Sequence, residues 1–191
     1  MTDYTSIDKC RVSKSNNLIP ILNLGEQYLT GVFPNEQNEK ITKGPLELVW
    51  CPESDLVQLK ESYNLDEMYG DNYGYRSGLN SSMVDHLQKK IRSLEKLADL
   101  NPTDTVLDIG SNDCTSLKAY TIKDINRIGI DPTGKKFSQY YPDDIKLVPD
   151  FFTAENFFSV SSKKCKIITS IAMFYDLEDP CSFAQNIEQS L

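Results

Sequence analysis

The sequence has no apolar run near the ~20 residues that a membrane-spanning helix needs, and no charged-then-apolar segment opens it. Basic residues are also few: 20 lysines and arginines stand against 28 aspartates and glutamates, a formal net charge of −8. A protein that binds nucleic-acid phosphates needs a basic face, which this charge argues against. We therefore expect a soluble, cytoplasmic protein that binds neither nucleic acid nor membrane.

Histidine and cysteine are scarce as well. The single histidine, His86, falls beside the apolar stripe of an expected helix, where surface or packing roles are commoner than catalytic ones. The five cysteines are an odd number in a chain without a secretion signal, so we expect reduced thiols. At 191 residues the chain can hold one medium domain and one small domain.

The most informative stretch is Val106–Thr115, VLDIGSNDCT. It predicts a buried strand that ends at Gly110, then a turn of small and polar residues, then a helix that begins at Thr115 or Ser116. A strand that ends at glycine lets a ligand approach the backbone, and helix N-terminal amides favour electron-rich groups. A second short strand, Arg127–Asp131, ends in a carboxylate that can accept both hydroxyls of a ribose. The pattern predicts a nucleotide-like cofactor.

Two cofactors compete for this turn. A dinucleotide fingerprint, GxGxxG, needs three glycines, but the chain has Gly110, Asn112 and Thr115. Asp108 is instead typical of enzymes that bind S-adenosylmethionine, which carries a sulfonium and an ammonium group and no pyrophosphate. Negative charge beside the turn attracts such a cation and repels a diphosphate. We favour S-adenosylmethionine over a dinucleotide and over an ordinary turn without a ligand. The residues expected to hold it here are Asp108, Gly110, Asn112 and Asp131.

Residues 1–63 read as a small β-rich module with too few apolar residues to be stable alone. Cys10 and Cys51 hint at a zinc ribbon, in which two CxxC pairs hold one tetrahedral metal ion. Here the second position of each pair is a serine, Ser13 or Ser54, and a hydroxyl is a poor zinc ligand at neutral pH. We expect a module that has lost its metal, with zinc on Cys10 and Cys51 as the alternative.

Residues 64–100 are expected to form a lid-like loop and a connecting helix. The loop, residues 64–78, combines three tyrosines with three glycines, so it can fold tightly and offer aromatic faces to a ligand. A tyrosine ring attracts a sulfonium by cation–π interaction, although packing of the tyrosines on the next domain is an equal alternative. Apolar residues at spacings of three and four then predict a helix from Asn80 to about Leu100.

Strands and helices alternate over residues 101–191, which predicts an open parallel sheet with ligands at the carboxyl ends of its strands. The third strand, Ile145–Phe152, carries Asp150, which can meet an adenine amino group, and Phe151 or the next phenylalanine can cover the ring. The apolar run Lys166–Phe174 predicts a central strand buried on both faces. Four strands are few for a complete sheet, so we expect a fragment or an exposed edge at which chains associate.

With these segments described, the chain resembles the sugar C-methyltransferase family over nearly all of its length. The likeness lies in the order of LNLGEQYLTGVFP, CPESDLVQL, MYGDNYGYRSGLNSSM, VLDIGSND, GIDPT and ITSIAMFYDLEDP. The resemblance implies an α/β fold: a zinc-ribbon-like module (1–63), the loop and helix (64–100), and an incomplete Rossmann-like class I methyltransferase domain (101–191). Family members continue well past this length.

The resemblance also implies a reaction, the C-methylation of a nucleotide-linked deoxy-ketosugar through an enolate. The family's catalytic base lies in the part that has no counterpart here, whereas Tyr75 is expected to reach the reaction chamber as a donor or orienting group. Cys114 replaces the family's glycine and is expected to crowd the methionine end of the cofactor. The alternatives are a truncated or degenerate S-adenosylmethionine-binding or scaffold protein, and a methyltransferase for another small molecule. The remaining residues expected at the cofactor are Tyr73, Ser77, Phe151 and Ser170.

Overall fold

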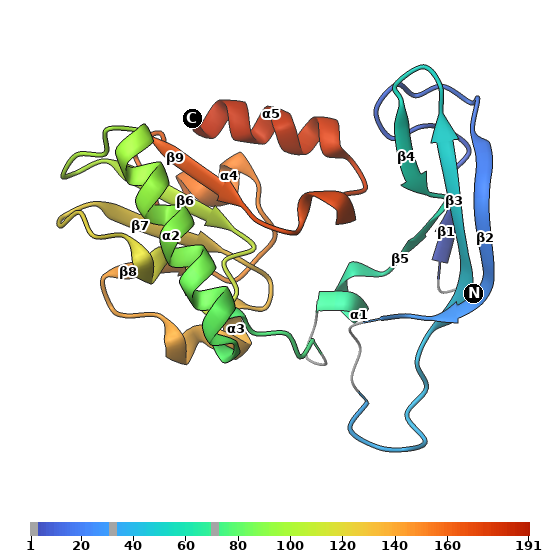
Figure 1. Ribbon diagram of the computed structural model, residues 1–191, viewed down its shortest axis with the longest axis horizontal. Helices are drawn as coiled ribbons and strands as arrows, with labels where there is room; N and C mark the ends of the chain where they lie inside the picture. The colour runs from blue at the N-terminus through green and yellow to red at the C-terminus, as the bar shows by residue number, and fades with distance from the viewer. Residues whose placement is uncertain (1–3, 31–33, 70–72) are drawn as a thin grey trace. The chain divides into compact units, whose positions relative to one another are not determined.

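The computed structural model describes residues 4–30, 34–69 and 73–191 (Figure 1). The chain divides into two compact units, one of Met1–Gly74 with Glu178–Cys181 and one of Tyr75–Leu177 with Ser182–Leu191. Part of the tyrosine- and glycine-rich loop, residues 70–72, lies outside the described ranges. Within those ranges, no helix is both long enough and apolar enough to cross a membrane.

The N-terminal unit is rich in β-structure, as the sequence predicts. Two antiparallel sheets make it up: a pair of strands, β1 with β5, and a three-stranded sheet in the order β2-β3-β4. The elements are β1 (Tyr4–Ser6), β2 (Ile19–Tyr28), β3 (Lys43–Cys51), β4 (Leu56–Leu59), β5 (Glu61–Tyr63) and the short helix α1 (Leu65–Tyr69).

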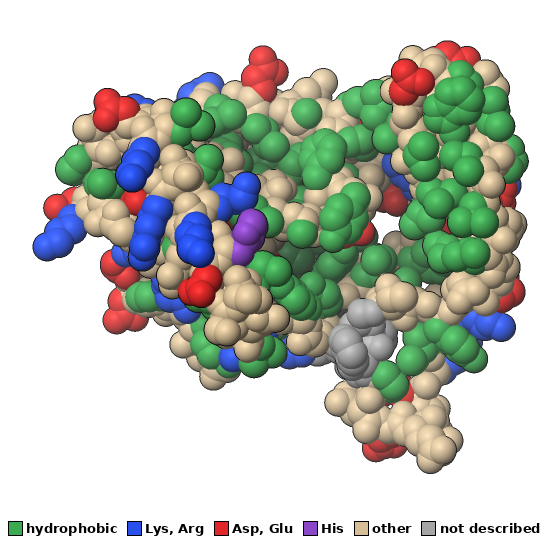
Figure 2. All heavy atoms as spheres, in the orientation of Figure 1, with side chains coloured by type: hydrophobic (Ala, Val, Ile, Leu, Met, Phe, Trp, Pro, Cys, Tyr) green, Lys and Arg blue, Asp and Glu red, His purple; other side chains and the backbone are tan. Residues whose placement is uncertain are grey.

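This unit has little apolar core. Among its described residues, the buried apolar and thiol side chains are Cys10, Val49 and Cys51. Large apolar side chains of the three-stranded sheet are exposed instead, including Ile21 at 55% and Leu24 at 54%, and Figure 2 shows hydrophobic side chains spread over this sheet. Apolar burial is therefore small here, and polar contacts must contribute to holding the unit together.

The second unit is a Rossmann-like α/β domain. Its four strands are all parallel and lie in the order β8-β7-β6-β9. The strands are β6 (Thr105–Ile109), β7 (Asn126–Ile130), β8 (Ile145–Val148) and β9 (Ile167–Ser170). The α-helices are α2 (Ser81–Leu97), α3 (Gly134–Phe137), α4 (Ala154–Phe158) and α5 (Pro180–Ser190). Short 3₁₀ turns are η1 (Ser77–Leu79), η2 (Leu117–Ala119), η3 (Ser138–Tyr140) and η4 (Phe174–Asp176).

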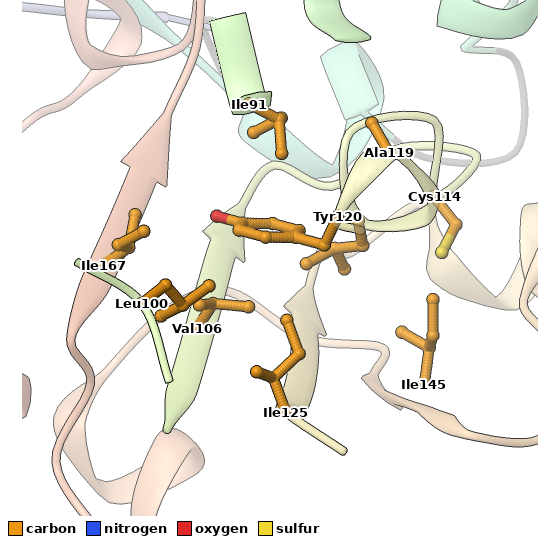
Figure 3. Packing of buried hydrophobic residues seen from close by; sticks show 10 residues of the cluster. Ile91, Leu100, Val106, Cys114, Ala119, Tyr120, Ile125, Ile145 and Ile167 are labelled. Carbon is orange, nitrogen blue, oxygen red and sulfur yellow. The ribbon is translucent and has the colours of Figure 1, made fainter. Parts of the chain in front are cut away.

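Alternate residues of β6 supply the cores on the two faces of the sheet, as the period of a strand requires. Val106 faces one cluster, which includes Ile91 of α2 and is shown in Figure 3. Leu107 and Ile109 face the other cluster, which includes Phe157 of α4 and Phe183 of α5. Helices thus cover both faces of the sheet, so only its edges remain accessible to a ligand.

Helix α2 forms where its apolar stripe predicts it. The side chain of Asn80 accepts the backbone N–H of Ser82 at 3.0 Å, which caps the first turn. Leu87 and Ile91 are buried on the inner face, whereas His86 is exposed on a surface that carries many lysine and arginine side chains (Figure 2).

Three predicted elements are shorter than expected. The third strand ends at Val148, because the N–H of Asp150 turns back to the carbonyl of Val148 at 2.9 Å. The apolar run Lys166–Phe174 gives only β9, since the chain turns at Ala172, where φ is 57°. In the described residues β9 pairs with β6, and no strand is paired with its other side among them. The helix after the first turn is the 3₁₀ turn η2.

Candidate functional site

The strand order places a switch point beside β6. The chain adds β7 and β8 on one side of β6 and then crosses to add β9 on the other side. In open α/β sheets, ligands bind outside the carboxyl ends of the strands at such a point. Ile109 of β6 is in register with Ile130 of β7 and with Ser170 of β9, so the loops that follow these residues define the candidate site.

The turn after β6 is tightly wound. Gly110, Asn112 and Cys114 all have left-handed backbone, with φ of 71°, 48° and 66°. Glycine adopts this conformation freely, asparagine tolerates it, and other side chains rarely do. The N–H of Gly110 donates to the carbonyl of Ile130 at 2.9 Å, which fixes the start of the turn against β7.

The sequence predicts that Cys114 crowds the cofactor, but in the structure its side chain points into the core. Its side chain is completely buried and belongs to the core cluster that contains Leu117 and Ile145 (Figure 3). Burial raises the pKa of the thiol to about 12, so the group is neutral at physiological pH. The side chain therefore acts as core packing beneath the turn.

Asp131 joins the two turns that follow β6 and β7. One carboxylate oxygen accepts the N–H of Asn112 at 2.7 Å, and the other accepts the N–H and the hydroxyl of Thr133 at 2.6 and 2.5 Å. The residue is 5% exposed. A carboxylate offers about four acceptor positions, and three are used here. One position is thus left for a ligand hydroxyl without disturbing the turns.

Asp108 lies within β6, two residues before Gly110, and is only 4% exposed. Its carboxylate accepts the hydroxyl of Thr169 in β9 at 2.5 Å. Burial raises the pKa of Asp108 to about 7, although hydrogen bonds from Thr169 and Ser116 work in the opposite direction. The carboxyl group of Asp108 is therefore close to its pKa at neutral pH, and a cationic ligand would favour its charged form.

The side chain of Asn112 is engaged within the protein. Its carbonyl oxygen accepts the N–H of Ser77 at 3.0 Å, and its amide donates to the carbonyl of Tyr75 at 3.1 Å. The neighbouring carboxylate of Asp113 accepts the N–H of Gly78 at 2.9 Å and lies 3.5 Å from the guanidinium of Arg76. These contacts fasten the segment Tyr75–Gly78 onto the turn after β6.

Several predicted site residues come together around this edge. Ser77 begins η1 on the fastened segment, and the ring of Tyr75 beside it is 49% exposed. The hydroxyl of Ser170, at the end of β9, is buried and has no hydrogen-bond partner among the described residues. Buried hydroxyls without a partner are rare in proteins, so this one is a candidate to contact a ligand at the switch point.

The remaining residues that the sequence predicts at the cofactor are Asp150, Phe151 and Tyr73. Asp150 and Phe151 follow the end of β8 and are exposed, and the carboxylate of Asp150 accepts the N–H of Phe151 at 2.7 Å. Tyr73 lies in the N-terminal unit, where its ring is 5.3 Å from that of Tyr69.

Thr133, Tyr141 and Thr169 also shape the turn, although the sequence does not predict them at the site. The contact of Thr133 with Asp131 has a sequence signal, because Asp-x-Thr is typical of a turn in which the aspartate side chain accepts the N–H two residues on. Tyr141 gives no such signal, yet its hydroxyl lies 2.7 Å from that of Ser111 and donates to the carbonyl of Asn112 at 3.1 Å. Thr169 is found only through the pairing of β9 with β6.

The residues expected at a metal lie together in the N-terminal unit. Cys10 is 3.2 Å from the hydroxyl of Ser54, and Cys51 is 3.3 Å from the hydroxyl of Ser13. Two thiols and two hydroxyls do not fit a structural zinc ion, which takes four thiolate or imidazole ligands. In the described ranges no group of three or more histidine, cysteine, aspartate or glutamate residues is placed to hold a metal ion.

Comparison with known proteins agrees with the motifs. Residues 10–69 match the family described as "Putative zinc binding domain". The chain is also 24% identical over 151 residues to the C-methyltransferase NovU of Streptomyces niveus, an alignment that covers 78% of this chain and 36% of that protein. The chain thus spans about a third of the length of this curated relative. The resemblance indicated by the motif order is confirmed for the N-terminal module and for similarity to a C-methyltransferase.

Proposed function

We propose that this chain is the cofactor-binding part of a C-methyltransferase that uses S-adenosylmethionine and acts on a nucleotide-linked ketosugar. The observation that carries the proposal is the set of groups at the switch point. Asp108 and Asp131 lie at the carboxyl ends of neighbouring strands, and the unpaired hydroxyl of Ser170 lies at the end of the third. The similarity to a C-methyltransferase supports the choice of cofactor.

Each group suits a part of the cofactor. Asp131 has one acceptor position left for a ribose hydroxyl, and Asp108 supplies negative charge near a cation. The backbone at Gly110 can be approached closely, because glycine carries no side chain. When bound, S-adenosylmethionine supplies an electrophilic methyl group on a sulfonium.

The chain's own part in the chemistry is to position a phenol. C-methylation beside a keto group needs a base for the carbon-bound proton and a donor for the developing oxyanion. Tyr75 is held next to the turn through its backbone carbonyl, and its ring is half-exposed, so its hydroxyl can act as that donor or orient the sugar. His86 is exposed on α2, so we assign the base to a residue outside this set.

Calorimetry with S-adenosylmethionine tests the binding step. We expect heat with the 191-residue chain, a strongly reduced affinity in D131N, and unchanged affinity in D85N, a control on the exposed side of α2. Absence of heat in a folded wild-type chain would contradict the proposal.

Transfer is tested separately in a longer protein that contains this chain. Labelled S-adenosylmethionine and a panel of nucleotide-linked ketosugars should give a labelled sugar product, and Y75F should lower kcat. Binding without transfer to any sugar in the panel would instead favour a binding protein or a different small-molecule acceptor.

A further inference from the structure

Two loops of the N-terminal unit meet through crossed pairs of side chains. Cys10 pairs with Ser54, and Cys51 pairs with Ser13, so each thiol contacts the hydroxyl of the opposite loop. The first loop follows β1, and the second connects β3 to β4. Both cysteines are 0% exposed, whereas Ser13 is exposed and Ser54 is half-buried, so each contact joins a buried thiol to a hydroxyl nearer the surface.

Both loops turn back on the carbonyl of their cysteine. In the first, the N–H of Lys14, four residues on, donates to the carbonyl of Cys10 at 3.0 Å; in the second, the N–H of Ser54, three residues on, donates to the carbonyl of Cys51 at 3.3 Å. The residue after each serine is left-handed, with φ of 60° at Lys14 and 54° at Asp55. In zinc ribbons, two such turns carry metal-ligand side chains at their first and fourth positions and together coordinate one tetrahedral metal ion.

Arg11, in the first loop, makes further polar contacts with β4 and β5. The guanidinium of Arg11 donates to the side chain of Gln58 at 3.2 Å and to the carbonyl of Leu59 at 2.7 Å. It also donates to the hydroxyl of Ser62 at 2.7 Å. Since the unit buries few apolar side chains, such polar links weigh heavily in its stability.

We propose that the N-terminal unit folds without metal. The crossed thiol–hydroxyl pairs link the two loops where relatives of this fold would use an ion, and Arg11 ties the first loop to β4 and β5. The backbone of a four-thiolate site is retained, and the two serines alone keep zinc out. Replacing both serines with cysteine therefore creates a zinc site.

Metal analysis of the whole chain, purified under reducing conditions, tests both parts of this inference. The wild-type protein should carry no stoichiometric zinc, and a chelator should leave its Tm unchanged. S13C/S54C should bind about one zinc per chain, with a Tm that falls on chelation, since a closed tetrahedral site takes four thiolates. The cobalt-loaded variant should show the absorption of a tetrahedral thiolate site.

S13A/S54A is the matched control, because it removes the hydroxyls without adding ligands. It should bind no zinc, and its Tm should fall by roughly 2–4 °C for each kcal/mol of lost hydrogen bonding. Stoichiometric zinc in the wild type, or a Tm unchanged in S13A/S54A, would overturn the metal-free link. A folded S13C/S54C without zinc would overturn the retained site; should that variant not fold, zinc binding by the S13C and S54C single variants decides the same point.

Discussion

The side-chain oxygen of Asn112 accepts the backbone N–H of Ser77 at 3.0 Å, across 35 positions of sequence. The same side chain donates to the carbonyl of Tyr75, so one amide satisfies two backbone groups of the segment that carries the expected catalytic tyrosine. Asn112 itself sits in the turn after β6, and its N–H is bound by Asp131. The proposed cofactor turn and the tyrosine segment are thereby fixed to each other.

N112A should release that segment. Loss of two hydrogen bonds leaves the backbone of Tyr75 and Ser77 without these partners, which should expose the peptide bond after Arg76 to trypsin. We expect cleavage after Arg76 to be several-fold faster than in the wild type, with cleavage after Lys89 in α2 as an internal reference. Mass spectrometry of timed digests measures both, and an equal increase at the two positions would indicate general destabilisation instead.

Asp108 should make stability depend on pH. Burial raises the pKa of its carboxyl to about 7, against about 3.9 in an unfolded chain. Between these values the folded protein binds more protons than the unfolded one. Its contribution to the free energy of unfolding is therefore complete below about pH 4 and is lost as the pH rises towards 7, by at most about 1.4 kcal/mol per unit.

Urea denaturation between pH 5 and pH 8 measures this slope. D108N keeps an acceptor for the hydroxyl of Thr169 but does not titrate, so it should remove the contribution of Asp108 and be more stable than the wild type at pH 8. As the pH rises from 5 to 8, the affinity of the wild type for S-adenosylmethionine should also rise, because the cation favours the charged carboxylate. Parallel stability curves for the two proteins would show that Asp108 does not titrate in this range.

Two buried tyrosines should respond oppositely to loss of the hydroxyl. The hydroxyl of Tyr120 lies within the core cluster of Figure 3 and has no hydrogen-bond partner among the described residues. An unpaired buried hydroxyl costs about 1–3 kcal/mol, so Y120F should raise the free energy of unfolding by about 1 kcal/mol. Tyr141 contacts Ser111 and the carbonyl of Asn112, so Y141F should lower it by about 1 kcal/mol. Chemical denaturation of both variants checks the signs, and the opposite order would contradict the assigned contacts.

Local patterns account for most of what the sequence predicts correctly. Gly110 ends a buried strand and Asp131 ends the next one, so both could be placed at the carboxyl edge of a parallel sheet. The position of β9 could not be predicted in this way. Ile167 packs in the cluster on one face and Ile168 beside the cluster on the other. A strand packed on both faces is apolar throughout, so its sequence does not tell which strand it pairs with.

The residues that contact the turn after β6 could not be predicted from local sequence patterns either. Asn112 is predicted at the cofactor from its place in the turn, whereas the hydrogen bonds of its side chain to Tyr75 and Ser77 depend on how the chain returns to the sheet. Cys114 looked like an obstacle because glycine is usual there in the family that the chain resembles. Its left-handed φ of 66° directs the side chain into the core, which spacing along the sequence does not reveal.

A pair of glycine substitutions separates backbone strain from loss of the site. Gly110 and Gly25 have nearly the same left-handed φ, 71° and 68°. A Cβ at Gly25 would meet nothing within 4 Å, and one at Gly110 would only touch Met173 at 3.4 Å. G110A and G25A should therefore each lower the free energy of unfolding by a similar amount, about 1–2 kcal/mol, from the left-handed conformation alone.

Their effects on binding should differ. The added methyl group at position 110 stands on the turn where the proposed cofactor meets the backbone, whereas position 25 lies in β2 of the other unit. We expect G110A to weaken binding of S-adenosylmethionine at least tenfold and G25A to leave it unchanged, both measured by calorimetry on folded protein. If the two variants bound equally well, close approach of the ligand to Gly110 would be excluded, and the turn would be left as a structural element of the sheet.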